Sequence, residues 1–250
     1  MKFQKDHVLI ADGRIEKLEV ESVANGIRDT LAQDGGSTWI FAQRALAAIE
    51  IDCSDCKYFE VGPRRGLHTI LIDLHKPKSI TCVEAPNKLR ADDRYLRENR
   101  LWIPNIQTEN LEVHYQDFDK FISEEKYDLL FYCGVLYHNI NQVGQLKKLH
   151  SIAADGAYMI FESATTRNED LMNKNVIEVH YPPYSPAARA QTCVFRPSKD
   201  ACKSMLDIAG WEIVETSDGQ DDVDNLNRIS ILCRKGFPRK NRHLSDKNLS

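Results

Sequence analysis

The sequence predicts an α/β fold built on a doubly wound, mostly parallel sheet of seven strands. Five short apolar runs, rich in β-branched and aromatic residues, alternate with segments of helical period. Strands separated in this way need crossover connections rather than hairpins, and crossovers produce parallel pairing. The chain then continues with one more helix and two strands joined by a short connection, "DGQDDVDNL". That spacing suits an antiparallel pair, so we expect an antiparallel last strand.

The first unit of this pattern is a strand, a turn and a helix. Residues 57–62, "KYFEVG", form a β-prone run that ends in glycine, and residues 79–86, "SITCVEAP", form a second buried-type strand. A charged helical stretch, residues 87–100, follows the second strand. The helix between the two strands is predicted by apolar residues at positions i, i+3, i+4 and i+7, which are Leu67, Ile70, Leu71 and Leu74.

The middle of the chain supplies three more strands. Residues 111–118 read as the third strand and residues 127–137 as the fourth. The fourth run is almost continuously apolar, which is typical of a strand covered on both faces. A helix is predicted over residues 143–152, and residues 157–163, "AYMIFES", follow as the fifth strand.

The last helix has predicted ends at both sides. Ser198 is a suitable N-cap, and Gly210 is a suitable C-terminal stop. The strands that follow are residues 211–217 and 227–235. The buried face of the helix is predicted to consist of Cys202, Met205, Leu206 and Ala209.

Length and composition predict one main domain. We expect an N-terminal extension with a helical cap over residues 1–55, the main domain over residues 56–235, and a basic tail over residues 236–250. No run reaches the roughly 18 uncharged apolar residues of a membrane span, and the opening residues lack a secretory signal. The seven cysteines are scattered through apolar segments, which suggests reduced thiols and a cytoplasmic location.

Charge and cysteine spacing argue against two classes of function. The net charge is −4, and the last residues from Arg234 on hold six basic side chains and one acid, which leaves −9 on the rest. An acidic body argues mildly against a large nucleic-acid footprint. Cys53 and Cys56 form a lone C-x-x-C, and zinc would need a second ligand pair at similar spacing, so we expect no metal.

Acidic residues follow three consecutive strands. The first strand runs through Glu60 and Gly62 to Gly66, and Glu84 lies 22 residues after Gly62 at the end of the second strand. Ligands of open parallel sheets bind at these strand ends, where glycines allow close backbone approach and an acid accepts from ribose hydroxyls. Asp117 follows the third strand. Three acids at strand ends fit a cofactor that has amino and hydroxyl donors and a positive charge. Two alternatives stay open: the glycines can form an ordinary strand-to-helix turn, and Asp117 can be a solvated loop residue.

Three segments carry a resemblance to a known family: "YDLLFYCGVLYHNINQVGQLKKL", "DGAYMIFES" and "FRPSKDACKSMLDIAGW". With the order of elements, they resemble the class I S-adenosylmethionine (SAM)-dependent methyltransferases over about residues 55–235, which implies a Rossmann-like fold and SAM as cofactor. The "GVLYH" motif is similar to the branch that includes tRNA wobble-uridine carboxymethyl-type transferases and small-molecule or sugar O-methyltransferases.

The resemblance implies a role for each strand end. The turn glycines hold the methionine part of SAM, the acid after the second strand holds the ribose, the acid after the third strand meets adenine, and the residues after the fourth strand line the transfer site. Arg64 departs from the family pattern because a glycine is usual there. By position, the implied cofactor-binding residues are Glu60, Gly62, Gly66, Glu84, Asp117, Phe118 and Cys133.

The residues after the fourth strand are the candidates for catalysis. His138 can act as a general base on a hydroxyl acceptor, or can simply hydrogen-bond a loop or the substrate. Tyr137 either packs over the cofactor or belongs to the core. The long segment after the fifth strand, with His180 and Arg189, is expected to form a substrate lid, and a solvated loop is the alternative. Trp39 and Phe41 are expected to close the other side of the cleft.

These expectations lead to an enzyme that methylates a small-molecule or saccharide-like acceptor with SAM. Two alternatives remain open. The acceptor can be RNA, with the tail, Arg64, Arg65 and Arg90 as phosphate contacts. The chain can also be a catalytically silent member in which Arg64 fills the pocket and the fold binds a partner.

Overall fold

The computed structural model describes residues 36–63, 66–73, 75–85, 110–180, 195–217 and 228–237. The main helices are α2 (Gly36–Ala48), α3 (Leu67–Asp73), α5 (Gln142–Ile152), α6 (Glu169–Met172) and α7 (Lys199–Ala209). Short 3₁₀ turns are η2 (Cys53–Asp55), η5 (Phe118–Lys120) and η6 (Leu136–His138). The strands are β1 (Lys57–Val61), β2 (Ser79–Glu84), β3 (Leu111–Tyr115), β4 (Tyr127–Cys133), β5 (Ala153–Ala164), β6 (Ile177–Val179), β7 (Phe195–Pro197), β8 (Trp211–Ser217) and β9 (Arg228–Lys235).

Seven strands form one sheet in the order β3-β2-β1-β4-β5-β9-β8. Strands β1 to β5 pair in parallel, whereas β9 inserts antiparallel between β5 and β8. The prediction of a doubly wound, mostly parallel sheet with an antiparallel last strand is therefore confirmed. The order reverses at β1, and Val61 pairs with Val83 on one side and with Tyr132 on the other. The carboxyl ends of β1, β2 and β4 consequently lie together at one edge.

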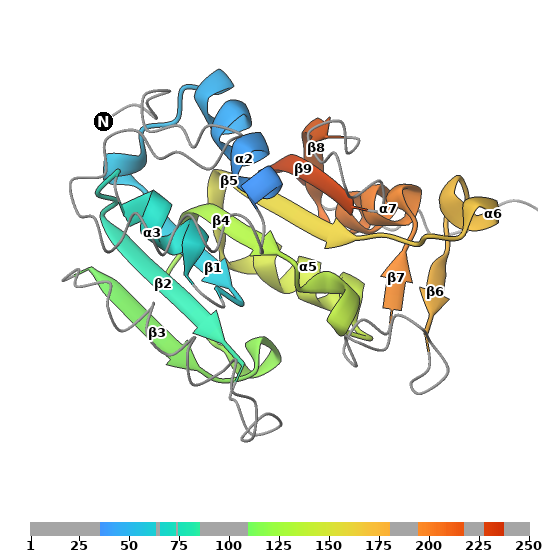
Figure 1. The fold of residues 1–250 in the computed structure, drawn as a ribbon. Coiled ribbons are helices and arrows are strands. Elements are labelled where there is room, and N and C mark those ends of the chain that lie inside the picture. Colours follow the sequence, from blue (N-terminus) through green and yellow to red (C-terminus); the bar gives the residue numbers. More distant parts are fainter. Residues whose placement is uncertain are drawn as a thin grey trace, which may run out of the picture.

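Helices cover both faces of this sheet (Figure 1). Alternate strand residues point to opposite faces, so each face has its own hydrophobic cluster. On one face, α5 and α7 pack against residues such as Phe59 and Tyr132. On the other, α2 and α3 pack against Tyr58 and Phe131. Trp39 of α2 is 1% exposed in this second cluster, and so is Phe41, so both side chains belong to the core rather than to an open cleft.

Helix α7 shows why the sequence could define its ends. The Ser198 hydroxyl accepts a hydrogen bond from the Ala201 amide at 3.0 Å, as an N-cap does. Gly210 has φ +97°, the left-handed conformation that ends a helix and favours glycine. Both predicted ends are confirmed, and the predicted apolar face is buried.

The strand boundaries differ from the prediction around the fourth and fifth strands. Strand β4 ends at Cys133, four residues early, because Gly134 has φ +73° and turns the chain into η6. Strand β5 begins at Ala153, directly after α5, and continues to Ala164. Helix α6 and the two-stranded β6–β7 ribbon, in which Glu178 pairs with Arg196, were not predicted. Figure 1 shows this ribbon beyond the arrowhead of β5.

Several expectations lie outside the described residues. They include the helix over residues 87–100, most of the N-terminal extension, and most of the basic tail. The proposed domain limits stay predictions. Within the part of the chain that the structure describes, no helix is long and apolar enough to cross a membrane.

Candidate functional site

The turn after β1 is formed by two glycines in left-handed conformations. Gly62 has φ +67°, and its amide donates to the Val83 carbonyl at 2.8 Å. A Cβ on Gly62 would lie 3.0 Å from the Val135 side chain, so the chain passes closely under the loop after β4. Gly66 has φ +75°, and its amide closes the turn onto the Pro63 carbonyl at 2.7 Å. Arg64 and Arg65, between them, lie outside the described residues.

Glu60 holds this turn against helix α3. Its carboxylate is buried and accepts hydrogen bonds from the Tyr58 hydroxyl at 2.9 Å and the Thr69 hydroxyl at 2.5 Å. Its other oxygen lies 3.2 Å from Nδ1 of His68. The His68 ring in turn lies 6.3 Å from the Trp39 ring, centroid to centroid, in a stacked arrangement. Glu60 therefore fixes the position of the turn, and a ligand would share its oxygens with three protein groups.

The next two acids lie along the same edge of the sheet. Glu84 is the last residue of β2, is half-buried, and pairs in register with Tyr115 of β3. One of its oxygens accepts from the Ala85 amide at 3.1 Å. Asp117 is exposed and lies 3.3 Å from the Lys120 ammonium. Phe118, beside it, is buried against Phe59 and Tyr132, so the side chain of this predicted site residue belongs to the core.

The loop after β4 places the predicted catalytic residues at the same edge. Cys133 points its thiol at the Ile160 carbonyl, 3.6 Å away, and burial raises its pKa well above the ordinary value, which makes it a poor nucleophile. Tyr137 is buried, and its ring centroid lies 4.2 Å from that of His138. His138 is exposed, with its backbone amide bonded to the Val135 carbonyl. The histidine thus faces solvent over a buried tyrosine.

A partly buried ion pair, which the sequence pattern did not indicate, lies beside Tyr137, with Glu162 buried and the Arg228 side chain 30% exposed. Arg228, the first residue of β9, donates to both oxygens of Glu162 on β5, at 2.5 and 2.8 Å. The Arg228 guanidinium also lies 5.8 Å from the centre of the Tyr137 ring. Burial alone would lower the pKa of Arg228, but the Glu162 carboxylate raises it above the ordinary value. A Cβ on Gly134 would lie 3.6 Å from the Tyr137 hydroxyl and 3.8 Å from Glu162, so the loop approaches this pair closely.

A polar cluster also lies on the β6–β7 ribbon. Glu178 accepts from the Thr166 hydroxyl at 2.5 Å, and its carboxylate lies 3.0 Å from Nε2 of His180. Arg196, opposite Glu178 across the ribbon, is only 7% exposed.

The ribbon is held to the loop after β4 because the Gln142 amide donates to the carbonyls of Leu136 and Phe195, at 3.2 and 2.8 Å. Of the lid residues predicted from the sequence, His180 belongs to this cluster, and residues 181–194 lie outside the described residues.

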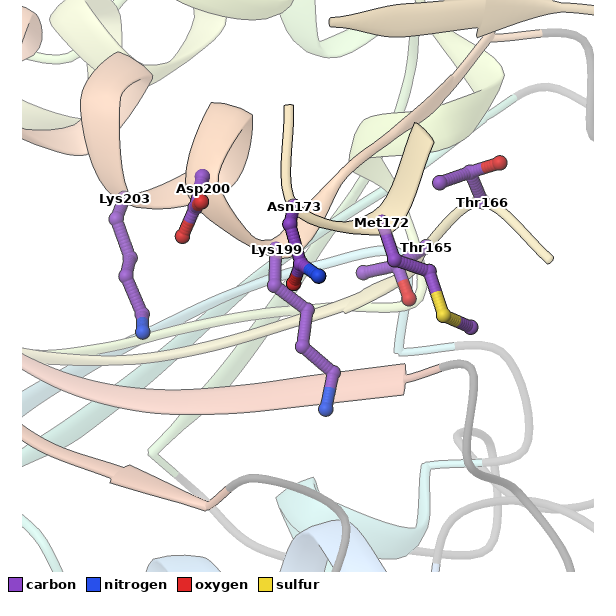
Figure 2. Close-up of a pocket in the computed structure, with 7 residues that line it drawn as sticks. All are labelled: Thr165, Thr166, Met172, Asn173, Lys199, Asp200 and Lys203. Carbon is purple, nitrogen blue, oxygen red and sulfur yellow. The ribbon is translucent and has the colours of Figure 1, made fainter. Parts of the chain in front are cut away.

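A cavity of about 300 Å³ lies between the end of β5, α6 and α7 (Figure 2). Figure 2 shows Lys199 and Lys203 extending from α7 in the same direction. Thr165, Thr166, Met172, Asn173 and Asp200 complete its lining. Among the described residues, no group of three or more histidines, cysteines or acids is placed to hold a metal ion.

One curated protein and many solved structures resemble this chain, whereas no family model matches it. The tRNA U34 carboxymethyltransferase of Wolinella succinogenes is 26% identical over 181 residues, which is 72% of this chain. The chain spans 60% of the length of that relative.

The solved structures show the fold. An S-adenosylmethionine dependent methyltransferase from Mesorhizobium loti superposes with a TM-score of 0.56 at 13% identity, over 80% of this chain and 99% of that one. The 1,6-didemethyltoxoflavin-N1-methyltransferase of Burkholderia thailandensis, solved with 1,6-didemethyltoxoflavin and S-adenosylhomocysteine, gives 0.58 at 12% identity, over 89% of this chain and 93% of that one. The strand order, the antiparallel last strand and these structural similarities agree, and the chain therefore has the class I SAM-dependent methyltransferase fold.

Proposed function

We propose that the chain binds SAM at the ends of β1, β2 and β3 and transfers its methyl group to a hydroxyl of a small or saccharide-like acceptor. The observation that carries the proposal is the juxtaposition of the Gly62 turn and the Glu84 carboxylate, which the register of β1 and β2 places at one edge. Parallel sheets bind nucleosides at this edge.

The residues present fit such a cofactor. The left-handed Gly62 exposes backbone where a side chain would crowd the Val135 loop. Glu84 ends β2 with a half-buried carboxylate, which can accept two hydrogen bonds from the vicinal hydroxyls of a ribose. Asp117, one strand further, is an exposed acceptor suited to an amino group. When bound, SAM supplies a methyl group on a positively charged sulfur, so a site lined by carboxylates also matches its charge.

The chain's own contribution to the transfer would be to orient the acceptor and remove its proton. Tyr137 is fixed beside the Glu162–Arg228 pair, and its ring supports the exposed imidazole of His138. His138 is then held at the rim of the site, where it can take a proton from an acceptor hydroxyl.

The direct test is to incubate the protein with methyl-labelled SAM and pools of cellular metabolites, and to identify labelled products by mass spectrometry. We expect a labelled hydroxyl compound and, by calorimetry, saturable binding of SAM. A protein that gives no heat on titration with SAM contradicts the proposal, whatever the acceptor.

Replacing His138 by glutamine is expected to lower kcat on the identified acceptor by about 100-fold or more, because general-base catalysis typically contributes that much. The Kd for SAM should not change, since His138 lies after β4, whereas the proposed contacts of the nucleoside come from the ends of β2 and β3. His150→Gln is the matched control, because this histidine lies at the other end of α5 and contacts the Gly236 carbonyl. Equal activity of the two variants would remove His138 from catalysis.

RNA is the second candidate acceptor, and the likeness to a tRNA-modifying enzyme is the observation that favours it. Lys199 and Lys203, which extend together from α7, are suited to phosphate groups. If RNA is the acceptor, the Lys203→Gln variant binds a bulk tRNA mixture more weakly and with a shallower salt dependence, whereas Lys147→Gln on the exposed side of α5 binds it normally. RNA binding that does not weaken with salt, or no binding, excludes this candidate.

A further inference from the structure

We infer that Arg196 binds an anionic group of the acceptor, either a terminal carboxylate or a terminal phosphate. The inference rests on the proposed function and names a binding site within it. Arg196 lies in the middle of β7 and is 7% exposed. Its Nε is buried and has no hydrogen-bond partner. Across the part of the chain that the structure describes, its guanidinium forms no ion pair.

This arrangement differs from that of the other arginine near the site. Arg228 is half-buried, and its Nε and one terminal nitrogen donate to the Glu162 carboxylate. A buried charge without a partner is costly, and proteins normally pair it. Arg196 therefore keeps an unused donor, Nε–H, on a largely buried guanidinium, and a guanidinium can hold an anion through two parallel hydrogen bonds.

The acidic side chain on the neighbouring strand of the ribbon already meets other groups. The carboxylate opposite Arg196 across the ribbon is Glu178, but its Oε2 meets the Thr166 hydroxyl at 2.5 Å and Nε2 of His180 at 3.0 Å. Glu178 is thereby directed to Thr166 and His180. The cluster can accept as well as donate, which suits a ligand with an anionic group and a neighbouring hydroxyl.

The place of Arg196 connects it with the transfer site. Strand β7 packs against η6, the turn that carries Tyr137 and His138. The Gln142 side chain ties the two together through the carbonyls of Leu136 and Phe195, and Thr166 donates its amide to the Pro197 carbonyl at 2.9 Å. An acceptor held at the ribbon would therefore extend toward the end of β4. Because so little of Arg196 is exposed, a terminal group can reach it more readily than a phosphodiester flanked by two sugars.

The test follows the Nε–H signal of Arg196 by NMR while inorganic phosphate or malonate is added to the full-length protein at constant ionic strength. We expect a saturable shift of this signal with at least one probe, and none with chloride. Arg196→Gln identifies the signal and should remove the binding. Arg167→Gln, which changes an exposed arginine near the ribbon, is the matched control and should bind as the wild type does.

The outcomes separate the two sources of the anion. A response to phosphate alone indicates a phosphorylated acceptor, a response to malonate alone indicates a carboxylic acid, and a response to both supports the shared chemistry. The inference is overturned if neither probe produces a saturable shift. It is also overturned if a uridine dinucleotide binds to Arg196 more tightly than phosphate and malonate do. SAM is titrated into the same samples: wild-type protein that fails to bind SAM contradicts the proposed function, whereas intact SAM binding without an anion response contradicts only the role of Arg196.

Thermal unfolding distinguishes this role from a structural one. Because Arg196 forms no ion pair with the residues that the structure describes, Arg196→Met should keep its unfolding midpoint within about 4 °C of the wild type, the shift that 1 kcal/mol produces in a domain of this size. A large fall in the midpoint, together with no anion response in the wild type, would show that Arg196 serves the fold alone.

Discussion

Replacing Glu162 by alanine is expected to lower the free energy of unfolding by about 2–3 kcal/mol, because it removes the acceptor of two hydrogen bonds from the half-buried Arg228 guanidinium, and hydrogen bonds to charged groups contribute about 1.5–3 kcal/mol. The two side chains are joined by two hydrogen bonds of 2.5 and 2.8 Å, and Glu162 is 2% exposed. Chemical denaturation followed by circular dichroism measures the change. The Tyr137 hydroxyl lies next to the same pair, so SAM binding and activity should fall as well.

An exposed ion pair in the same protein provides the control. Arg44 and Glu215 are 3.1 Å apart with side chains 52% and 35% exposed, and Glu215→Ala should cost no more than about 1 kcal/mol. The double variant Glu162→Met, Arg228→Met should recover most of the loss, because removing both charges removes the cost of burial. A Glu162→Ala protein as stable as Glu215→Ala would show that solvent fully replaces Glu162 as the partner of Arg228 and that the pair does not stabilise the fold.

Glu84→Ala is expected to raise the Kd for SAM by about 100-fold. The carboxylate would lose two hydrogen bonds to ribose hydroxyls, and hydrogen bonds to a charged group contribute about 1.5–3 kcal/mol each. The fold should change little, because Glu84 is a half-buried residue at the end of its strand, and one of its oxygens accepts from the amide of the next residue, Ala85. Calorimetric titration with SAM measures the effect.

Two further variants make this result specific. Glu84→Gln keeps the shape but loses the charge, so its Kd should fall between those of the wild type and Glu84→Ala. Glu112→Ala changes an exposed acid on β3, next to His114, and should bind SAM normally. If Glu84→Ala binds SAM as tightly as Glu112→Ala does, the nucleoside lies elsewhere and the proposed site is wrong.

The fold was predictable because its signals are local. The Ser198 cap, the Gly210 stop and the apolar period between them define α7 within a dozen residues. The end of β4 was misplaced for a local reason too, because apolar residues continue beyond Gly134 although the backbone turns there at φ +73°. Pattern alone does not distinguish a buried strand from a buried turn.

The site residues stay predictions. Gly62, Glu84 and His138 were predicted because they follow strands, and strand ends meet at one edge in a parallel sheet. Glu60 was assigned to the cofactor, but its oxygens meet Tyr58, Thr69 and His68, which a strand pattern cannot show. The β6–β7 ribbon was missed because each of its strands has only three residues.

The sequence by itself determined the order and direction of the strands, the turn glycines and the ends of the last helix, because hydrophobic period, capping and left-handed turns act between near neighbours. Only the tertiary structure decided which charges meet. Glu162 and Arg228 are 66 residues apart and become partners because β9 inserts next to β5. Arg196 is buried opposite Glu178 but remains without an ion pair among the described residues. Pairing of this kind depends on long-range register and on the low dielectric of a buried site, which no local pattern encodes.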